Sequence, residues 1–301
     1  MMMKKSNILF TGGTGFFACS LLDMISAGSW HNCYFTMLSR HAEEFAQLHP
    51  KYSSLPNVKF VSSDVRLLKA YKNHFHYIIH AATPAVNSPE DAELQDIIVN
   101  GTRLILDFAQ RAGTEKILYI SSGGVYGNGT APFSEEMVCN PVSAYGKAKL
   151  EAEQLVLQSA IPSSIMRGFA FCGKHLPRNA HFAFGNFLEA ALNNQEIIIK
   201  GDGTPLRSYM HADDLACWMM TMLFEGRAGR IYNCGSPEAV SIKALAERIN
   251  ALLNPSGKIT VQTPAVPGGA ASSYVPDVTL AESELGLKLQ VSLDEAIRRS
   301  V

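Results

Sequence analysis

The chain has 301 residues, 47% hydrophobic and 18% charged, a composition typical of a well-packed soluble protein with one large domain and a smaller attached lobe. Its 26 Lys and Arg against 27 Asp and Glu give a formal net charge of -1, so the overall charge offers no basic surface for nucleic acid or acidic membranes. The six cysteines lack the paired spacing of a disulfide framework or a zinc site, and no segment approaches the roughly 20 apolar residues that span a bilayer, so we expect a cytoplasmic protein without metal or membrane contact.

The first predicted strand, residues 7–11, runs directly into a glycine-rich turn at 12–18, and a helical pattern follows over 19–25. Gly12 and Gly15 let the backbone turn tightly and approach a pyrophosphate, whose charge is met by amide groups and by the positive end of the helix. A glycine-rich turn alone is weak evidence, but a strand before it and a helix after it are the context of a dinucleotide site. The predicted cofactor contacts in this turn are Gly12, Thr14, Gly15, Phe16 and Phe17.

The second predicted strand, 34–38, leads into Ser39 and Arg40 and has no acidic residue at its end. An Asp or Glu there would hold the adenosine ribose hydroxyls of NAD, whereas a guanidinium pairs with the 2′-phosphate of NADP. We therefore expect Arg40 to favour NADP. NAD stays possible, because the alternative is that Arg40 is only a solvated loop charge.

The third and fourth predicted strands cover 58–62 and 77–80. Asp64 and Val65 follow the third strand and are candidate contacts for the adenine edge, with a helix cap as the alternative role of Asp64. His80 ends the fourth strand, where we expect it beside the cofactor rather than in catalysis.

An amphipathic helix is predicted between the fourth and fifth strands, because apolar residues from Leu94 to Phe108 recur at spacings of three and four. This apolar face is larger than a lone surface helix normally exposes, which favours a dimer formed by helix pairing. The alternative is that the face packs wholly against its own sheet.

The fifth predicted strand, 116–121, is followed by the segment 122–127, which begins with Ser122 and two glycines. Open α/β sheets bind their ligands beyond the carboxyl ends of the strands. We therefore expect the Ser122 hydroxyl to donate a hydrogen bond to a substrate oxygen.

Tyr145 and Lys149 lie at the start of a predicted helix, one turn apart on one face. A phenol has an ordinary pKa of about 10, but an adjacent ammonium and a cationic nicotinamide favour its ionised form. A Tyr and a Lys at this spacing are common by chance, but Ser122 at the end of the preceding strand favours a catalytic role for the pair. We assign catalysis to Ser122, Tyr145 and Lys149, with Tyr145 and Lys149 also contacting the cofactor.

A sixth strand is predicted at 164–167, after which the regular alternation of strands and helices breaks down. The sequence therefore predicts an α/β fold with a doubly wound parallel sheet, covered by helices on both faces. We assign 1–168 to a dinucleotide-binding domain, to which 212–235 returns. Residues 169–211 and 236–301 then form a smaller α/β substrate-binding lobe.

These features resemble the extended short-chain dehydrogenases/reductases of the NAD-dependent epimerase/dehydratase family, which have the Rossmann fold and act on nucleotide sugars. The resemblance covers nearly the whole chain. The matching segments are Thr11 to Ala18, Asp64-Val65, His80-Ala81-Ala82, Asn100, Ser121 to Gly127, Tyr145 to Lys149 and Gly201 to Leu215.

The resemblance implies that Arg207 contacts the diphosphate of a nucleotide sugar, a role that suits the guanidinium group. It also implies a homodimer, because the family commonly pairs such helices in a four-helix bundle. The further candidate cofactor contacts are Ala81, Ala82 and Asn100. The further candidate substrate contacts are Thr83, Ser122, Gly123, Tyr145 and Phe184.

Two departures from the family pattern carry information. The 4,6-dehydratases of the family have an Asp-Glu pair where this chain has Gly123 and Gly124, and without that acid and base the usual elimination of water has no proton carriers. The chain also has Ala170 and Cys172 where the family commonly has Asn and Tyr. The first departure argues against a dehydratase.

Three functions are compatible with these residues. We favour reduction of a dTDP-linked 4-keto-6-deoxyhexose with NADPH, because Arg40 favours the reducing cofactor and Gly123-Gly124 carry no acid or base. The alternative is a 4-epimerase of the UDP-hexose type, which uses the same residues and retains its cofactor. A catalytically silent NAD(P)-binding protein would need neither Tyr145 nor Lys149.

Overall fold

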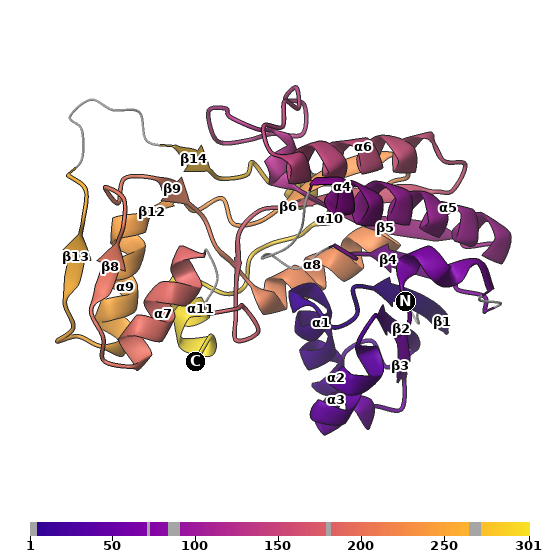
Figure 1. Ribbon diagram of the computed structural model, residues 1–301, viewed down its shortest axis with the longest axis horizontal. Coiled ribbons are helices and arrows are strands. Elements are labelled where there is room, and N and C mark those ends of the chain that lie inside the picture. The colour runs from indigo at the N-terminus through magenta and orange to yellow at the C-terminus, as the bar shows by residue number, and fades with distance from the viewer. Residues whose placement is uncertain (1–4, 71–72, 84–90, 179–181, 265–271) are drawn as a thin grey trace. The chain divides into compact units, whose positions relative to one another are not determined.

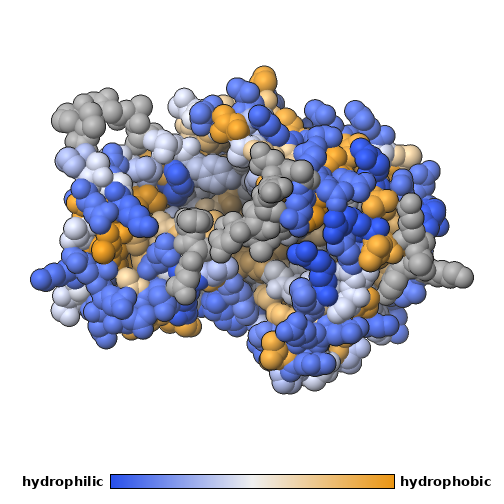
Figure 2. Space-filling model, viewed as in Figure 1, coloured by the Kyte–Doolittle hydropathy of each residue, from blue (hydrophilic) through white to orange (hydrophobic). Residues whose placement is uncertain are grey.

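The computed structural model describes residues 5–70, 73–83, 91–178, 182–264 and 272–301. The chain forms two compact units. Unit 1 comprises Met1–Asn128, Val138–Gly168 and Ala216–Tyr232, and unit 2 comprises Gly129–Met137, Phe169–Leu215 and Asn233–Val301. Within the described ranges no helix is long and apolar enough to cross a membrane, and Figure 2 shows hydrophilic residues interspersed with small apolar groups over one face of the molecule.

Unit 1 is built around a seven-stranded parallel sheet flanked by helices (Figure 1). Its strands are β1 (Ser6–Thr11), β2 (Cys33–Ser39), β3 (Val58–Ser62), β4 (Tyr77–His80), β5 (Lys116–Ser122), β6 (Ser163–Gly168) and β11 (Arg230–Cys234), of which the last continues into unit 2. Its helices are α1 (Phe16–Ser26), α2 (Ala42–Leu48), α3 (Pro50–Ser53), η1 (Val65–Ala70), α4 (Asp91–Gln95), η2 (Asp96–Asn100), α5 (Gly101–Ala112), η3 (Gly123–Val125), α6 (Ala144–Gln158) and most of α8 (Ala212–Phe224).

The strand order in this sheet is β11-β6-β5-β4-β1-β2-β3. The chain moves outward from β1 through β2 to β3, then crosses to β4 and continues outward to β5 and β6. The strands are rich in β-branched and aromatic residues, as expected for strands covered on both faces. The predicted α/β fold with a doubly wound sheet is confirmed, and each of the six predicted strands is present with ends within one residue of the expected ones.

Helices α5 and α6 lie side by side against the sheet (Figure 1). Ile98 and Val99 pack with Tyr119, Ala152 and other residues of β5, α6 and β6, while Ile105 and Phe108 enter a second core cluster beside β4 and β5. The apolar residues from Leu94 to Phe108 therefore pack largely within their own unit. Packing against their own sheet and one neighbouring helix covers most of this stripe, and the homodimer stays a prediction.

Unit 2 contains short strands and four helices within its described residues. The strands are β7 (Phe171–Cys172), β8 (Ile197–Ile199), β9 (Leu206–Arg207), β10 (Met210–His211), β12 (Val240–Ser241), β13 (Ile259–Val261) and β14 (Ser273–Tyr274), and the helices are α7 (Ala183–Leu192), α9 (Ile242–Leu253), α10 (Thr279–Leu285) and α11 (Leu293–Arg299). Helices α7, α9 and α11 bury apolar faces together with β8 in one core cluster. The strands pair in three small sheets, with the orders β10-β7, β12-β9-β14 and β13-β8.

Candidate functional site

The glycine-rich turn after β1 is closely packed between the ends of β2 and β4. Gly12 has φ of +77°, and a Cβ there would lie 2.9 Å from the Ala81 carbonyl oxygen. A Cβ on Gly13 would lie 2.7 Å from the Leu38 amide nitrogen. Only glycine allows this conformation and this approach, so the turn has the form of a phosphate cradle.

Helix α1 begins directly after this cradle. Gly15 is its N-cap residue and is exposed, and as a glycine it has no side chain to cover the first amide groups of the helix. Phe16 and Phe17 follow it, half-buried and edge-to-face with ring centroids 6.1 Å apart. A helix N-terminus of this kind favours an anion, so these residues fit the pyrophosphate of a dinucleotide.

The end of β2 carries the predicted cofactor-selecting residue. The Thr14 and Ser39 hydroxyls lie 2.9 Å apart and join the turn to β2. Arg40 follows Ser39 and is exposed, and its charge acts on the carboxylate of Asp64 at the end of β3. A cation therefore follows β2 at the position where an NAD-selecting site has a carboxylate.

Asp64 is held by Arg66, which donates to one carboxylate oxygen from Nε at 2.8 Å and to the other from Nη2 at 2.7 Å. These hydrogen bonds lower the pKa of Asp64, against the opposing effect of its burial. The remaining guanidinium nitrogen donates to Asp96 at 2.6 Å, and the Asn100 amide donates to the same carboxylate at 2.9 Å. Asp96 and Asn100 are the ends of η2, a π-helical turn, a rare element that is frequent at functional sites. Val65 is buried in the apolar core.

His80 connects the cofactor-side loops through a directed chain of hydrogen bonds. The Thr102 hydroxyl donates to the Ile98 carbonyl, so it accepts from Nε2–H of His80 at 3.1 Å. His80 Nδ1 then accepts from the Thr11 hydroxyl at 2.7 Å, which itself accepts from the Ala82 amide. Burial and the charge of Lys149 lower the pKa of His80 to about 3, so the ring is neutral. The histidine therefore fixes the Ala81-Ala82 segment against the glycine turn, as the Ala81 amide also does by donating to the Thr11 carbonyl.

Tyr145 lies where two hydroxyl groups converge. Burial raises the pKa of its phenol, and hydrogen bonds with Ser122 and Thr83 oppose that rise. The Ser122 hydroxyl also accepts from the Gly124 amide at 3.1 Å. Thr83 after β4, Ser122 at the end of β5 and Tyr145 on α6 therefore meet. Without cofactor, the Tyr145 phenol is protonated near neutral pH.

Lys149 is 2% exposed, and its Nζ donates to the Ile120 carbonyl at 2.9 Å. It lies 5.8 Å from the ring centroid of Tyr145 and 5.1 Å from that of Tyr119. Burial lowers the pKa of Lys149 to about 8, with the Glu153 carboxylate opposing that effect. In the protein without cofactor, burial raises the pKa of Tyr145, so its expected ionisation by Lys149 together with a cationic nicotinamide stays a prediction.

Gly123 and Gly124 bring no proton-carrying side chain to this cluster. A Cβ on Gly146 in the first turn of α6 would lie 2.7 Å from the Gly124 carbonyl, so η3 and α6 approach closely through two glycines. A Cβ on Gly124 would lie 3.3 Å from the Ser122 hydroxyl. The backbone here positions Ser122 beside Tyr145.

Three residues of the site went unassigned in the sequence. Gly13 donates its amide to the Leu38 carbonyl at 2.9 Å and admits the close approach to β2. Glu153 and Arg167 form a buried ion pair next to Lys149. In the sequence, only the spacing of four residues between Lys149 and Glu153 indicates Glu153, because it places both residues on one helix face.

Arg207 and Phe184 belong to unit 2. Arg207 is half-buried in β9, where it is opposite Val240 of β12 and Tyr274 of β14, and its Nη1 donates to the Leu206 carbonyl at 2.8 Å. Phe184 is 1% exposed and packs in the core of the unit, with its ring centroid 5.4 Å from that of Tyr209. Within the described residues no group of three His, Cys, Asp or Glu is arranged to hold a metal ion.

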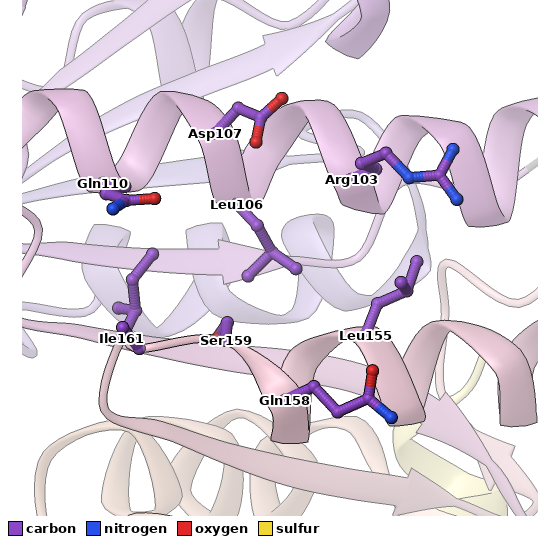
Figure 3. A pocket seen from close by; sticks show the side chains of 9 residues that line it. Arg103, Leu106, Asp107, Gln110, Leu155, Gln158, Ser159 and Ile161 are labelled. Atoms are coloured by element: carbon purple, nitrogen blue, oxygen red, sulfur yellow. The ribbon is translucent and has the colours of Figure 1, made fainter.

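A groove of about 310 Å³ lies between α5 and the end of α6 (Figure 3), and none of its lining residues is a candidate site residue. Figure 3 shows Leu106, Leu155 and Ile161 pointing into the space between the two helices. Arg103, Asp107 and other polar residues border it. The groove has an apolar floor and a charged rim.

Comparison with known proteins gives a consistent result. The sequence profile of the family described as "NAD dependent epimerase/dehydratase family" matches residues 8–235. The chain is 26% identical to a UDP-N-acetyl-alpha-D-glucosaminuronate decarboxylase of Bacillus cytotoxicus over 99% of this chain and 97% of that protein. It is 26% identical to a dTDP-4-dehydro-6-deoxyglucose reductase of Escherichia coli, with the same coverage of both chains. The crystal structure of a UDP-glucuronic acid 4-epimerase from Bacillus cereus, in complex with UDP-glucuronic acid and NAD, superposes with a TM-score of 0.82, covering 98% of this chain and 97% of that chain at 22% identity.

Proposed function

The chain belongs to the NAD dependent epimerase/dehydratase family, and on this premise we propose that it reduces a dTDP-linked 4-keto-6-deoxyhexose with NADPH. It is an enzyme of the extended short-chain dehydrogenase/reductase type, and its relatives act on nucleotide sugars. The observation that carries the proposal is the end of β2, where Arg40 is exposed and the nearby Asp64 is engaged by Arg66.

Arg40 supports NADP because a guanidinium forms charge-assisted hydrogen bonds with a phosphate. The carboxylate of Asp64 is occupied in a bidentate pair and is therefore poorly placed to accept from ribose hydroxyls. We propose that Gly12, Gly15 and the first turn of α1 hold the pyrophosphate, and that Arg40 holds the 2′-phosphate. Ala81, Ala82 and Asn100 complete the cofactor contacts in this proposal, and Lys149 holds the nicotinamide ribose.

When bound, the reduced nicotinamide supplies a hydride to the ketone carbon. In the proposed reaction the Tyr145 phenol donates its proton to the ketone oxygen, and the Ser122 and Thr83 hydroxyls hold that oxygen in place. The raised pKa of Tyr145 suits this direction, because an acid must be protonated before it can donate. A reduced nicotinamide carries no positive charge that would ionise the phenol beforehand.

Substrate binding by unit 2 is proposed to rest on Arg207. Its guanidinium suits a diphosphate, and its side chain is half-buried on β9, where Nη1 donates to the Leu206 carbonyl. Gly123 supports a reductase over a dehydratase, because neither it nor Gly124 can carry a proton for elimination.

The test is turnover of dTDP-4-keto-6-deoxyglucose by the purified protein, following NADPH absorbance and identifying the product by NMR. We expect one NADPH to be oxidised per product formed, and no oxidation by the Tyr145→Phe variant.

The alternative function is a UDP-hexose 4-epimerase, which the fold shared with a 4-epimerase supports. Interconversion of UDP-hexoses with constant NADPH absorbance would replace the reductase by the epimerase. Release of CO₂ from a UDP-uronic acid would instead place the chain with the decarboxylases.

We further propose that the enzyme is a homodimer joined through α5 and α6. The groove offers Leu106 and Leu155 as an apolar floor, and Arg103 and Asp107 lie one turn apart at its rim. Across a two-fold axis, Arg103 of one protomer can pair with Asp107 of the other, since an isologous interface must be self-complementary. We expect light scattering at micromolar concentration to give a dimer, Arg103→Asp to weaken it, and Arg103→Asp combined with Asp107→Arg to restore it. A monomeric unmodified protein would remove this proposal.

We also propose a cytoplasmic location. Cys33, Cys139, Cys172 and Cys234 form no disulfide, and three of them are buried. Unpaired thiols persist in a reducing compartment. Recovery of the protein in a membrane or extracytoplasmic fraction of fractionated cells would contradict the proposal.

A further inference from the structure

Helix α6 carries a second buried charge one turn beyond Lys149. Glu153 is 1% exposed and lies on the same face of the helix, because residues four apart are neighbours on a helix surface. The Ser121 hydroxyl at the end of β5 donates to its Oε1. The carboxylate is therefore fixed beside the strand that ends in Ser122.

Arg167 completes this arrangement from β6. It is 3% exposed and donates to Glu153 from Nε at 3.0 Å and from Nη2 at 2.7 Å. Its guanidinium carbon lies 4.8 Å from the ring centroid of Tyr126. The pair thus joins β5, α6 and β6. A buried ion pair is weak evidence for stability, because apolar residues of similar volume often serve the fold equally well.

The surroundings of Lys149 give the pair a second role. Its Nζ has one hydrogen bond to the protein in the described structure, to the neutral carbonyl of Ile120. The carboxylate that acts on it is Glu153, which opposes the effect of burial on the pKa of Lys149. The titratable and charged groups around Lys149 are His80 on β4, Tyr119 on β5, and Tyr145 and Glu153 on α6. Those around Arg167 on β6 are Glu153, Tyr126 after η3, and Cys139 in the loop before α6.

We propose that Glu153 is a positioning residue that keeps Lys149 in its charged form, while Arg167 and Ser121 keep the Glu153 carboxylate ionised and oriented. The inference deepens the proposed function, because a charged Lys149 serves turnover only if it holds the ribose and supports Tyr145. The charge of Lys149 itself is measurable without substrate or cofactor. His80 is neutral and Arg167 is cationic, so neither supplies the negative charge that Lys149 needs.

The experiment separates charge from shape at position 153. Lysine residues of the whole protein are labelled with ¹³C, and the Cε resonance of Lys149 is titrated by NMR, with Lys149→Met identifying the resonance. Glu153→Gln keeps the shape and removes the charge, whereas Glu153→Asp keeps the charge and shortens the side chain. We expect Glu153→Gln to lower the Lys149 midpoint from about 8 by roughly one pH unit, and Glu153→Asp to leave it within about 0.3 unit.

Each outcome decides the proposal. If both variants leave the midpoint unchanged, or if Glu153→Asp shifts it more than Glu153→Gln does, Glu153 acts only through shape and the proposal is wrong. The melting temperature of each variant is measured alongside. Should Glu153→Gln fail to fold, Glu153→Gln combined with Arg167→Met must show a lower midpoint than Arg167→Met alone, because these two variants differ only in the carboxylate charge. If the protein reduces no keto sugar, the proposed function is wrong, but the titration still tests whether Glu153 keeps Lys149 charged.

Discussion

The glycine turn after β1 and the cluster of Ser122, Tyr145 and Lys149 on β5 and α6 lie at the same edge of one parallel sheet, yet they are built in opposite ways. The conformation of the turn requires glycine, because Gly12 has a positive φ and its Cα lies too close to the Ala81 carbonyl to carry a side chain. The cluster depends on ionisable groups, chiefly the half-buried Tyr145 and the buried Lys149. Substitutions that add a side chain to the turn should therefore weaken cofactor binding at every pH. The cluster should tolerate changes of shape but respond to single atoms that carry protons.

The largest effect is expected in the cluster, from removal of one oxygen atom. Tyr145→Phe should lower kcat by about 10³-fold or more, because the proton donor is lost, while NADPH affinity stays within about twofold. Stopped-flow or steady-state kinetics and calorimetry measure the two quantities. Tyr34→Phe, at an exposed position on β2, is the matched control and should keep full activity. Retention of more than about a tenth of the activity by Tyr145→Phe would show that another group donates the proton.

The next effect concerns the turn, where adding one carbon atom should be decisive. Gly12→Ala should weaken NADPH binding by about 100-fold or more, because the new Cβ meets backbone that cannot yield. Gly28→Ala is the control, since Gly28 also has positive φ, at +96°, but has open space around its Cβ position. It should lose only about 1–2 kcal/mol of folding stability and bind NADPH normally. Equal NADPH affinities of the two variants would contradict the cradle.

A smaller effect tests the charged rim beside the turn. Arg40→Ala should narrow the preference for NADPH over NADH by roughly ten- to a hundredfold, because the pairing with the 2′-phosphate is lost. Calorimetry at one fixed salt concentration measures both affinities. Lys51→Ala, which removes an exposed cation paired with Asp23, should leave the preference unchanged. Equal affinity of the unmodified protein for both cofactors would rule out this role for Arg40.

The smallest effect is graded with pH and belongs to the cluster alone. Lys149 has a pKa lowered to about 8 by burial, so its ammonium form is lost as pH rises through that value. We expect kcat/KM, which reports the free enzyme, to fall about tenfold per unit above roughly pH 8. Lys149→Arg, whose guanidinium stays charged, should be slower but should lose this decline. A profile that is flat to pH 10 in the unmodified protein would show that the charge of Lys149 is not required.

The sequence by itself determined the local elements of unit 1. The runs at 7–11 and 116–121 are short, apolar and bounded by turn residues, so they form strands wherever a sheet is available, and both do. The glycine turn is equally local, because only glycine adopts the conformation of Gly12. Tyr145 and Lys149 share a helix face because helical spacing alone dictates it.

Only the tertiary structure decided which apolar side chains are buried within the chain and which charged side chains form ion pairs. Phe184 is a candidate substrate contact in the sequence, and the structure buries it in the core of unit 2. The stripe from Leu94 to Phe108 is covered mainly by β5, α6 and neighbouring strands. Glu153 and Arg167 are 14 residues apart and lie on different elements, so no local pattern joins them. Burial and pairing between distant residues depend on how strands and helices pack, and that packing is a property of the whole sheet rather than of any one segment.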